Sequence, residues 1–149
     1  MTVMNVAKFE RFFRLAASLD VDKEDLRRYS DFVHKKAYDL LLRGQANAKA
    51  NGRDVIEPFD LPITKGLQES CHAYRRINEE IELEPILQGL AQLPQLDMAY
   101  GEETVARLPE IYGGLSYALA RSFKIVDPRL KNPQTAHWET AFQLFDLLL

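Results

Sequence analysis

Residues Asp22–Leu67 have the sequence DKEDLRRYSDFVHKKAYDLLLRGQANAKANGRDVIEPFDLPITKGL. The first part predicts one long helix, because apolar residues recur at steps of three and four over several turns, the spacing of a single helix face. The residues on this face are Leu26, Tyr29, Val33, Ala37, Leu40 and Leu41. Asp22 suits the N-cap of this helix, and the acidic residues that follow it complement the helix dipole.

A short turn follows the long helix. Asn51-Gly52 suits a left-handed helix cap, because glycine takes a positive φ at little cost. Arg53–Ile56 then predicts a short extended piece. Asp60 with Pro62 predicts the opening of a third helix, which continues to about Glu80.

The segments on either side also predict helices. Asn5–Ala17 carries three phenylalanines on one face, which indicates a first helix anchored in a core. In the second half, residues 85–90 predict a short helix, and Gly101 opens a long helix that runs to about Phe123. Asn132 with Pro133 predicts the start of a final helix. Its aromatic residues favour a core position over an exposed assembly surface; they are Trp138, Phe142 and Phe145.

The helices follow a short–long–short order twice, which predicts an all-α fold. We expect one compact domain over residues 1–149, made of a first motif over 1–80 and a second, degenerate motif over 81–149. Gly44 and Gly113-Gly114 lie midway along the two long helices, which suits a crossing of these helices there. An irregular helical bundle with a coincidental repeat is the alternative.

Composition and charge narrow the function classes. The 149 residues carry a net charge of −3, and the first 80 hold 14 basic and 13 acidic side chains against 5 and 9 in the remainder. DNA-coating proteins usually carry a positive excess, so DNA binding is disfavoured though possible. No apolar run is long enough for a membrane helix. Cys71 is the single cysteine, which predicts a reducing, cytoplasmic location.

The turn residues carry a family resemblance. From about Ala7 to Leu67 the chain resembles an archaeal-type histone, and the specific part is Gly52–Ile56 followed by Asp60-Leu61. The whole chain resembles the small bacterial family of single-chain histone-fold doublets known as domain of unknown function 1931. This resemblance implies two histone folds paired within one chain as a pseudo-dimer, and a clamp between Arg53 and Asp60. It carries no activity.

The same resemblance suggests candidate DNA-binding residues, namely Arg14, Lys23, Arg53, Arg129 and Lys131. Paired histone folds lie head to tail, so Lys23 would lie near Arg129 and Lys131 at one end and could hold a phosphate. Arg53, at the other end, would have acidic neighbours. Val55 stands where the family commonly has threonine, so a hydroxyl contact to phosphate is lost. Ordinary solvated charges are the alternative interpretation.

Catalytic and metal chemistry have no support in the sequence. His34, His72 and His137 lie on different predicted helices without metal-ligand spacing, and Cys71 suits a small buried hydrophobe. We therefore expect no enzyme activity, no metal, no cofactor and no small-molecule substrate. Two functions remain: a protein-interaction or assembly module, which includes self-association, and a weak, sequence-independent DNA-binding protein of the nucleoid.

Overall fold

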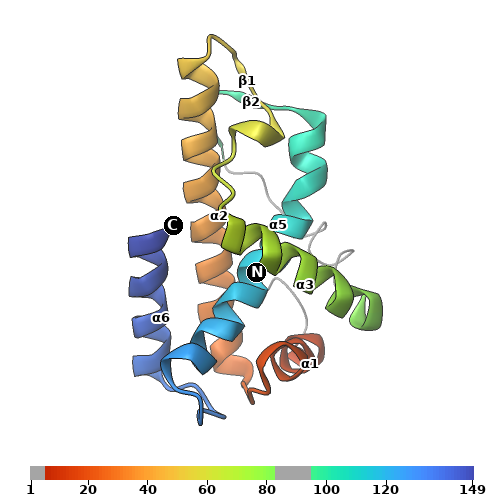
Figure 1. The fold of residues 1–149 in the computed structure, drawn as a ribbon, viewed down its shortest axis with the longest axis vertical. Coiled ribbons are helices and arrows are strands. Elements are labelled where there is room, and N and C mark those ends of the chain that lie inside the picture. The colour runs from red at the N-terminus through yellow and green to blue at the C-terminus, as the bar shows by residue number, and fades with distance from the viewer. Residues whose placement is uncertain (1–5, 83–94) are drawn as a thin grey trace.

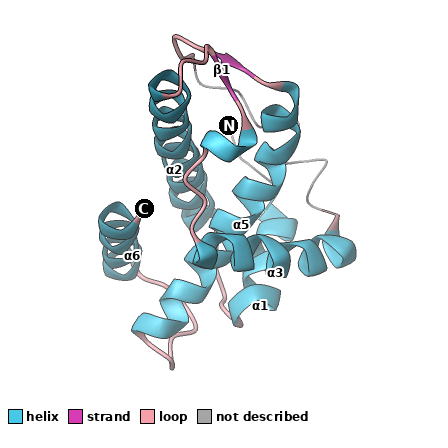
Figure 2. Ribbon diagram, turned by 45° about the horizontal axis from the view of Figure 1, so that its top comes forward, coloured by secondary structure: helices cyan, strands magenta, loops and turns pink. Residues whose placement is uncertain are grey.

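The computed structural model describes residues 6–82 and 95–149, and it is mainly α-helical with a small two-stranded sheet (Figures 1 and 2). In chain order the elements are α1 (Val6–Ala17), α2 (Lys23–Ala50), β1 (Val55–Ile56), the 3-10 helix η1 (Pro58–Asp60), α3 (Lys65–Ile81), β2 (Ala99–Tyr100), α5 (Glu102–Val126) and α6 (Thr135–Leu148). The prediction of a mainly helical fold is therefore confirmed. The short helix predicted over residues 85–90 lies outside the described residues, and the division into motifs at residue 80 stays a prediction.

The long helix α2 has both ends that the sequence predicts. The Asp22 carboxylate accepts hydrogen bonds from the backbone N–H groups of Glu24 and Asp25, at 2.9 and 3.1 Å. Asp25 returns a bond by accepting the N–H of Asp22 at 3.1 Å, which completes a capping box. At the other end Gly52 has a φ of +71°, so the chain leaves the helix through the left-handed region.

Two predicted helix starts are wrong. The third helix begins at Lys65, because Thr64 caps it by accepting the N–H of Leu67 at 3.1 Å. Asp60 ends the separate turn η1 instead, and Pro62 lies in the link between the two. The final helix begins at Thr135 rather than at Pro133, after the N-cap residue Gln134.

Both helix starts differ from the prediction because the hydrogen bonds of the capping side chains are different from those the sequence suggests. The Asp60 carboxylate accepts hydrogen bonds from Arg53 and from the backbone N–H of Glu57, so it does not cap α3. At α6 the backbone N–H of Gln134 donates to His137 Nδ1 at 2.9 Å, a reciprocal cap that the Asn-Pro signal does not reveal.

A pair of short parallel strands joins the end of α2 to the start of α5 (Figure 2). Val55 lies opposite Ala99, and Ile56 lies opposite Tyr100. The carbonyl of Ile56 accepts two hydrogen bonds, from the N–H of Gly101 at 2.9 Å and from the Thr104 hydroxyl at 2.6 Å. The loop after α2 is thereby fixed against the first turn of α5.

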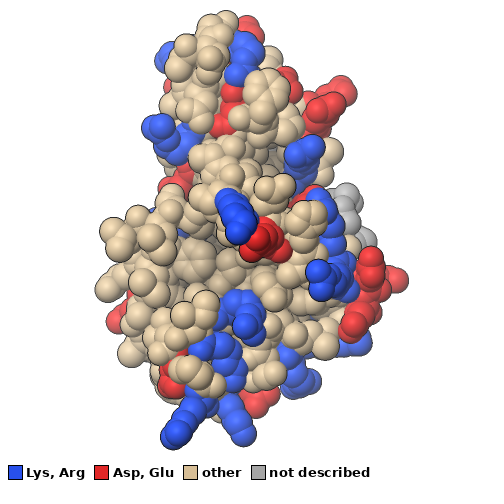
Figure 3. Space-filling view, viewed as in Figure 1, with Lys and Arg blue, Asp and Glu red and all other residues tan. Residues whose placement is uncertain are grey.

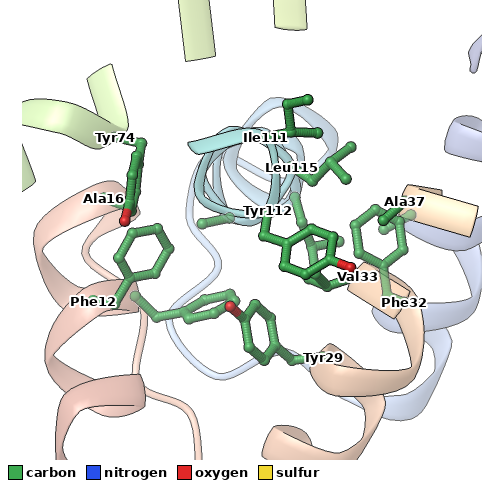
Figure 4. Close-up of a cluster of buried hydrophobic side chains, with 14 of the residues drawn as sticks. Phe12, Ala16, Tyr29, Phe32, Val33, Ala37, Tyr74, Ile111, Tyr112 and Leu115 are labelled. Atoms are coloured by element: carbon green, nitrogen blue, oxygen red, sulfur yellow. The ribbon is translucent and has the colours of Figure 1, made fainter. Parts of the chain in front are cut away.

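Buried side chains from the helices form one connected core (Figure 4). Phe12 of α1, Tyr29 of α2 and Tyr112 of α5 are among the side chains that gather in it, and each is buried. The helix α6 lies along α2 (Figure 1), where the Phe32 and Phe142 rings stack at a centroid distance of 5.5 Å. Trp138 is only 1% exposed, so the aromatic side of α6 packs inward.

The mid-helix glycines mark different contacts from the one expected. A Cβ at Gly113 would overlap the Tyr74 ring of α3, and a Cβ at Gly114 would overlap the Cys71 thiol of α3. A Cβ at Gly44 would lie 2.8 Å from the Leu61 side chain. These glycines therefore make room for α3 and for the residues before it, and the expected crossing of the two long helices at the glycines is wrong.

Candidate functional site

The loop after α2 is held by a two-point ion pair. Arg53 Nη1 donates to Asp60 Oδ2 at 2.6 Å, and Nη2 of the same guanidinium bonds the other carboxylate oxygen. Asp60 is only 2% exposed, and it also accepts the N–H of Glu57 at 2.8 Å. The hydrogen bonds from Arg53 hold the pKa of Asp60 below its usual range. The planar guanidinium of Arg53 matches the geometry of the carboxylate, so the ion pair joins the start of the loop at Arg53 to its end at Asp60.

The five residues suggested for DNA binding do not form one site. Arg53 lies past the C-terminal end of α2, whereas Lys23 is its first residue. A helix of 28 residues, rising about 1.5 Å per residue, separates the two by roughly 40 Å. Arg53 is also engaged with Asp60, and its guanidinium carbon lies 4.7 Å from the centre of the Phe59 ring.

The other four basic residues belong to segments that meet at the opposite end. The backbone N–H of Asp20 donates to the carbonyl of Lys131 at 2.7 Å, so the loop before α2 is joined to the loop before α6. Lys23, Arg129 and Lys131 are exposed and have no ion pair with a described residue. Arg14 lies 3.9 Å from the Asp20 carboxylate. Figure 3 shows basic side chains at this lower end with acidic ones among them.

A second surface feature is an apolar face. An open groove of about 560 Å³ lies between the start of α3 and the last turns of α5 and α6. Its lining is almost wholly uncharged and includes Leu67, Ile125, Val126, Leu144, Phe145 and Leu148. Ile125 and Leu148 are 76% and 73% exposed, and the neighbouring Leu147 is 80% exposed. Figure 3 shows the uncharged surface between α6 and the start of α3, hollowed at its centre.

A third feature is a polar cleft of about 570 Å³ between residues 58–63, α3 and the first half of α5. The histidine and the charged residues of its described lining are His72, Arg75, Glu103, Arg107 and Glu110. Arg75 donates to His72 Nδ1 at 2.9 Å and forms an ion pair with Glu110. Cys71 also contributes to the lining, but burial raises the pKa of its thiol to about 11, so the thiol stays protonated at neutral pH.

Two absences concern the part of the chain that the structure describes. Residues 6–82 and 95–149 contain no group of three or more His, Cys, Asp or Glu side chains that could hold a metal ion. In the same residues no helix is both long enough and apolar enough to cross a membrane.

Sequence reasoning missed two of these features. Lys36 of α2 is 3% exposed, and its ammonium group pairs with Asp146 of α6 and lies 3.5 Å from Asp39. Its position gave a signal, because it lies three residues after Val33 and four before Leu40 on the buried face. The sequence carries no comparable signal for the polar cleft, because its lining comes from separate segments of the chain.

Comparison with known proteins places the chain in a family. Residues 9–146 match the family model described as "Domain of unknown function (DUF1931)". Two Aquifex aeolicus (strain VF5) proteins, each described as an uncharacterized protein, are 31% identical over 109 residues, or 72% of this chain. The matched region spans 63% and 65% of the length of these relatives.

Two solved structures are similar over nearly the whole chain. A crystal structure of a Thermus thermophilus protein has 54% sequence identity and a TM-score of 0.87, covering 99% of both chains. A crystal structure of an Aquifex aeolicus protein has 26% identity and a TM-score of 0.81, covering 99% of this chain and 96% of the other.

Proposed function

We propose that this chain, which belongs to the family described as "Domain of unknown function (DUF1931)", is a non-catalytic pair of histone folds that acts as an assembly module. In this proposal the two motifs pair within the chain, and the apolar face formed by α3, α5 and α6 binds a second copy of the same chain. The apolar groove is the observation that carries the assembly role.

Three structural features support the pairing of two histone folds. The Gly-Arg turn after α2 holds Asp60 through Arg53, as the resemblance to histones implies. The parallel strands β1 and β2 join the loop after one long helix to the loop before the other. The two long helices, α2 and α5, each follow a loop and share the buried core.

The apolar face suits self-association. Five of the ten large apolar side chains that are exposed among the described residues lie at the ends of α5 and α6: Ile125, Val126, Leu144, Leu147 and Leu148. The same face therefore carries a groove and, beside it, protruding leucines. In a symmetric dimer the leucines of each copy can enter the groove of the other copy. Among the described residues that line the groove, Arg121 is the single charged side chain, so two copies approach this face with little like-charge repulsion.

The oligomeric state tests the proposal. Sedimentation velocity of the full chain at micromolar concentration is expected to show a dimer, and Leu147→Glu is expected to shift it to monomer. Leu147 is 80% exposed, so this change does not disturb the core. Val105→Glu, at a 41% exposed position near the start of α5, is the matched control and is expected to stay dimeric. A wild-type monomer at these concentrations would refute self-association through this face.

Weak, sequence-independent DNA binding is the second candidate. It is favoured by the Asp20–Lys131 backbone bond, which joins the loop directly before Lys23 to the loop that carries Arg129. Anisotropy titrations of duplex DNA should then weaken linearly with the logarithm of salt concentration. The double variant Lys23→Gln, Arg129→Gln should lower affinity and reduce that slope, whereas flat anisotropy at low salt would reject this candidate.

A further inference from the structure

The polar cleft is lined by two kinds of residue. Apolar surface comes from Pro58 and Phe59 of η1, from Leu61 and Ile63, and from Ile111 of α5. The charged residues come from α3 and α5. The cleft volume of about 570 Å³ falls within the range of small-molecule sites, roughly 300–1,000 Å³.

The ring of Phe59 is exposed and yet held in place. It is 75% exposed, which is unusual for a large aromatic side chain, and the guanidinium of Arg53 lies 4.7 Å from its centre. Because Arg53 is fixed by Asp60, the ring is anchored at the rim of the cleft. Because the ring is already held in place, little conformational entropy of this side chain is lost when a ligand binds against it.

The charges of the cleft divide into a satisfied pair and an open pair. Arg75 is taken up by Glu110 and by His72 Nδ1, so it is not free to bind a ligand anion. Glu103 and Arg107 lie one helical turn apart on α5 and make no ion pair with each other or with another described residue. The described lining of the cleft thus presents an open carboxylate and an open guanidinium together with apolar residues.

The histidine adds a directed donor. Since Arg75 always carries its proton and donates to Nδ1, the neutral ring of His72 has its proton on Nε2. Among the described lining residues two arginines balance two glutamates, so a dianion such as phosphate gains little attraction there. A small molecule with one positive and one negative group matches the open pair better.

We propose that this cleft binds a small zwitterion with an apolar body, of the chemical class of the apolar α-amino acids. The carboxylate is held by Arg107 through a two-point contact, and the ammonium group is held by Glu103. The apolar side chain lies against Phe59 and Ile63. The cleft lies between residues 58–63, α3 and the first half of α5; Figure 1 shows where these segments lie in the fold.

Isothermal titration with three probes of one shape tests each charge separately. L-phenylalanine carries both groups, 3-phenylpropionate lacks the ammonium group, and phenethylamine lacks the carboxylate. Saturable binding of L-phenylalanine is expected, with each analogue weaker by about tenfold or more, since a lost charge contact is worth about 1.4 kcal/mol or more.

Variants on the exposed surface then assign the contacts. Arg107→Gln is expected to weaken L-phenylalanine about tenfold and to leave phenethylamine unchanged, whereas Glu103→Gln should leave 3-phenylpropionate unweakened. Arg76→Gln and Glu79→Gln are matched controls at exposed positions of α3 outside the cleft and should bind as wild type. Absence of saturable L-phenylalanine binding, equal binding of 3-phenylpropionate, or equal binding by Arg107→Gln would each overturn the proposal. The oligomeric state is measured by a separate experiment on the apolar face. Ligand binding in the cleft and self-association can therefore each fail without the other.

Discussion

The hydroxyl of Tyr29 on α2 lies 2.7 Å from the hydroxyl of Ser116 on α5, inside the buried core. Ser116 donates its own proton to the carbonyl of Tyr112 at 2.7 Å, so Tyr29 is the donor of the bond between the two helices. Burial raises the pKa of Tyr29 well above its usual value, which keeps this donor protonated at any physiological pH. One directed bond therefore fixes how the two long helices face each other.

Removing the acceptor of this bond should cost more than removing the donor. Ser116→Ala leaves the buried Tyr29 hydroxyl without its partner and is expected to lower the free energy of unfolding by about 1–3 kcal/mol. Tyr29→Phe removes the donor, while Ser116 keeps its bond to Tyr112, so the expected loss is about 0.5–1.5 kcal/mol. Urea denaturation measures both, and in the double variant the losses should not add. Equal or reversed losses would contradict the assigned direction of the bond.

The glycine at position 114 should not tolerate a methyl group. A Cβ there would overlap the Cys71 thiol and lie 3.1 Å from the Cys71 backbone nitrogen, so α3 must move away from α5. Gly114→Ala is expected to lower the free energy of unfolding by about 1–3 kcal/mol, despite the better helix propensity of alanine.

Gly66 provides the matched control. It lies in the first turn of α3, and a Cβ there meets nothing within 4 Å. Gly66→Ala is expected to stabilise the protein by about 0.5–1 kcal/mol, as measured by the same denaturation. A destabilisation of similar size in both variants would indicate a general effect of alanine rather than contact between α3 and α5.

The ion pair of Arg53 and Asp60 should make stability depend on pH in the acid range. The pKa of Asp60 in the folded chain lies below its ordinary value of 3.8, so its contribution is present above that value and is lost as the pH falls through the folded pKa. Asp60→Asn should lower the melting temperature by several degrees at pH 7. The gap from wild type should narrow below about pH 4. A gap that stays constant down to about pH 2 would exclude the carboxylate charge as its source.

The buried Lys36 should make α6 sensitive to its partner. Asp146→Ala leaves the Lys36 ammonium group with Asp39 alone, at 3.5 Å, and is expected to destabilise the chain by about 1–2 kcal/mol. Adding Lys36→Met removes the unpaired charge from the core and should restore part of that loss. Thermal denaturation of the single and double variants distinguishes the effect of the unpaired charge from lost packing. A double variant less stable than Asp146→Ala would refute the explanation by unpaired charge.

The sequence alone determined much of the helical plan. Residues 23–50 form one helix because the apolar spacing and the two end signals, Asp22 and Gly52, are local properties of the chain. The starts of α3 and α6 were predicted wrongly for the opposite reason. Asp60 is a good local cap, but Arg53 and the Glu57 amide take its carboxylate, and only the fold reveals that competition.

Only the tertiary structure decided what the surface presents. The sequence identified basic residues, yet the length of α2 separates Arg53 from the cluster around Lys23 and Arg129. The apolar groove draws its lining from residues 64–70, 118–126 and 144–149, and the polar cleft draws its lining from residues 58–75 and 103–111, so distant parts of the chain form each of them. Spacing along a chain fixes the faces of one helix, whereas a surface between helices depends on how those faces pack. For that reason the candidate sites emerged only once α3, α5 and α6 had been placed together.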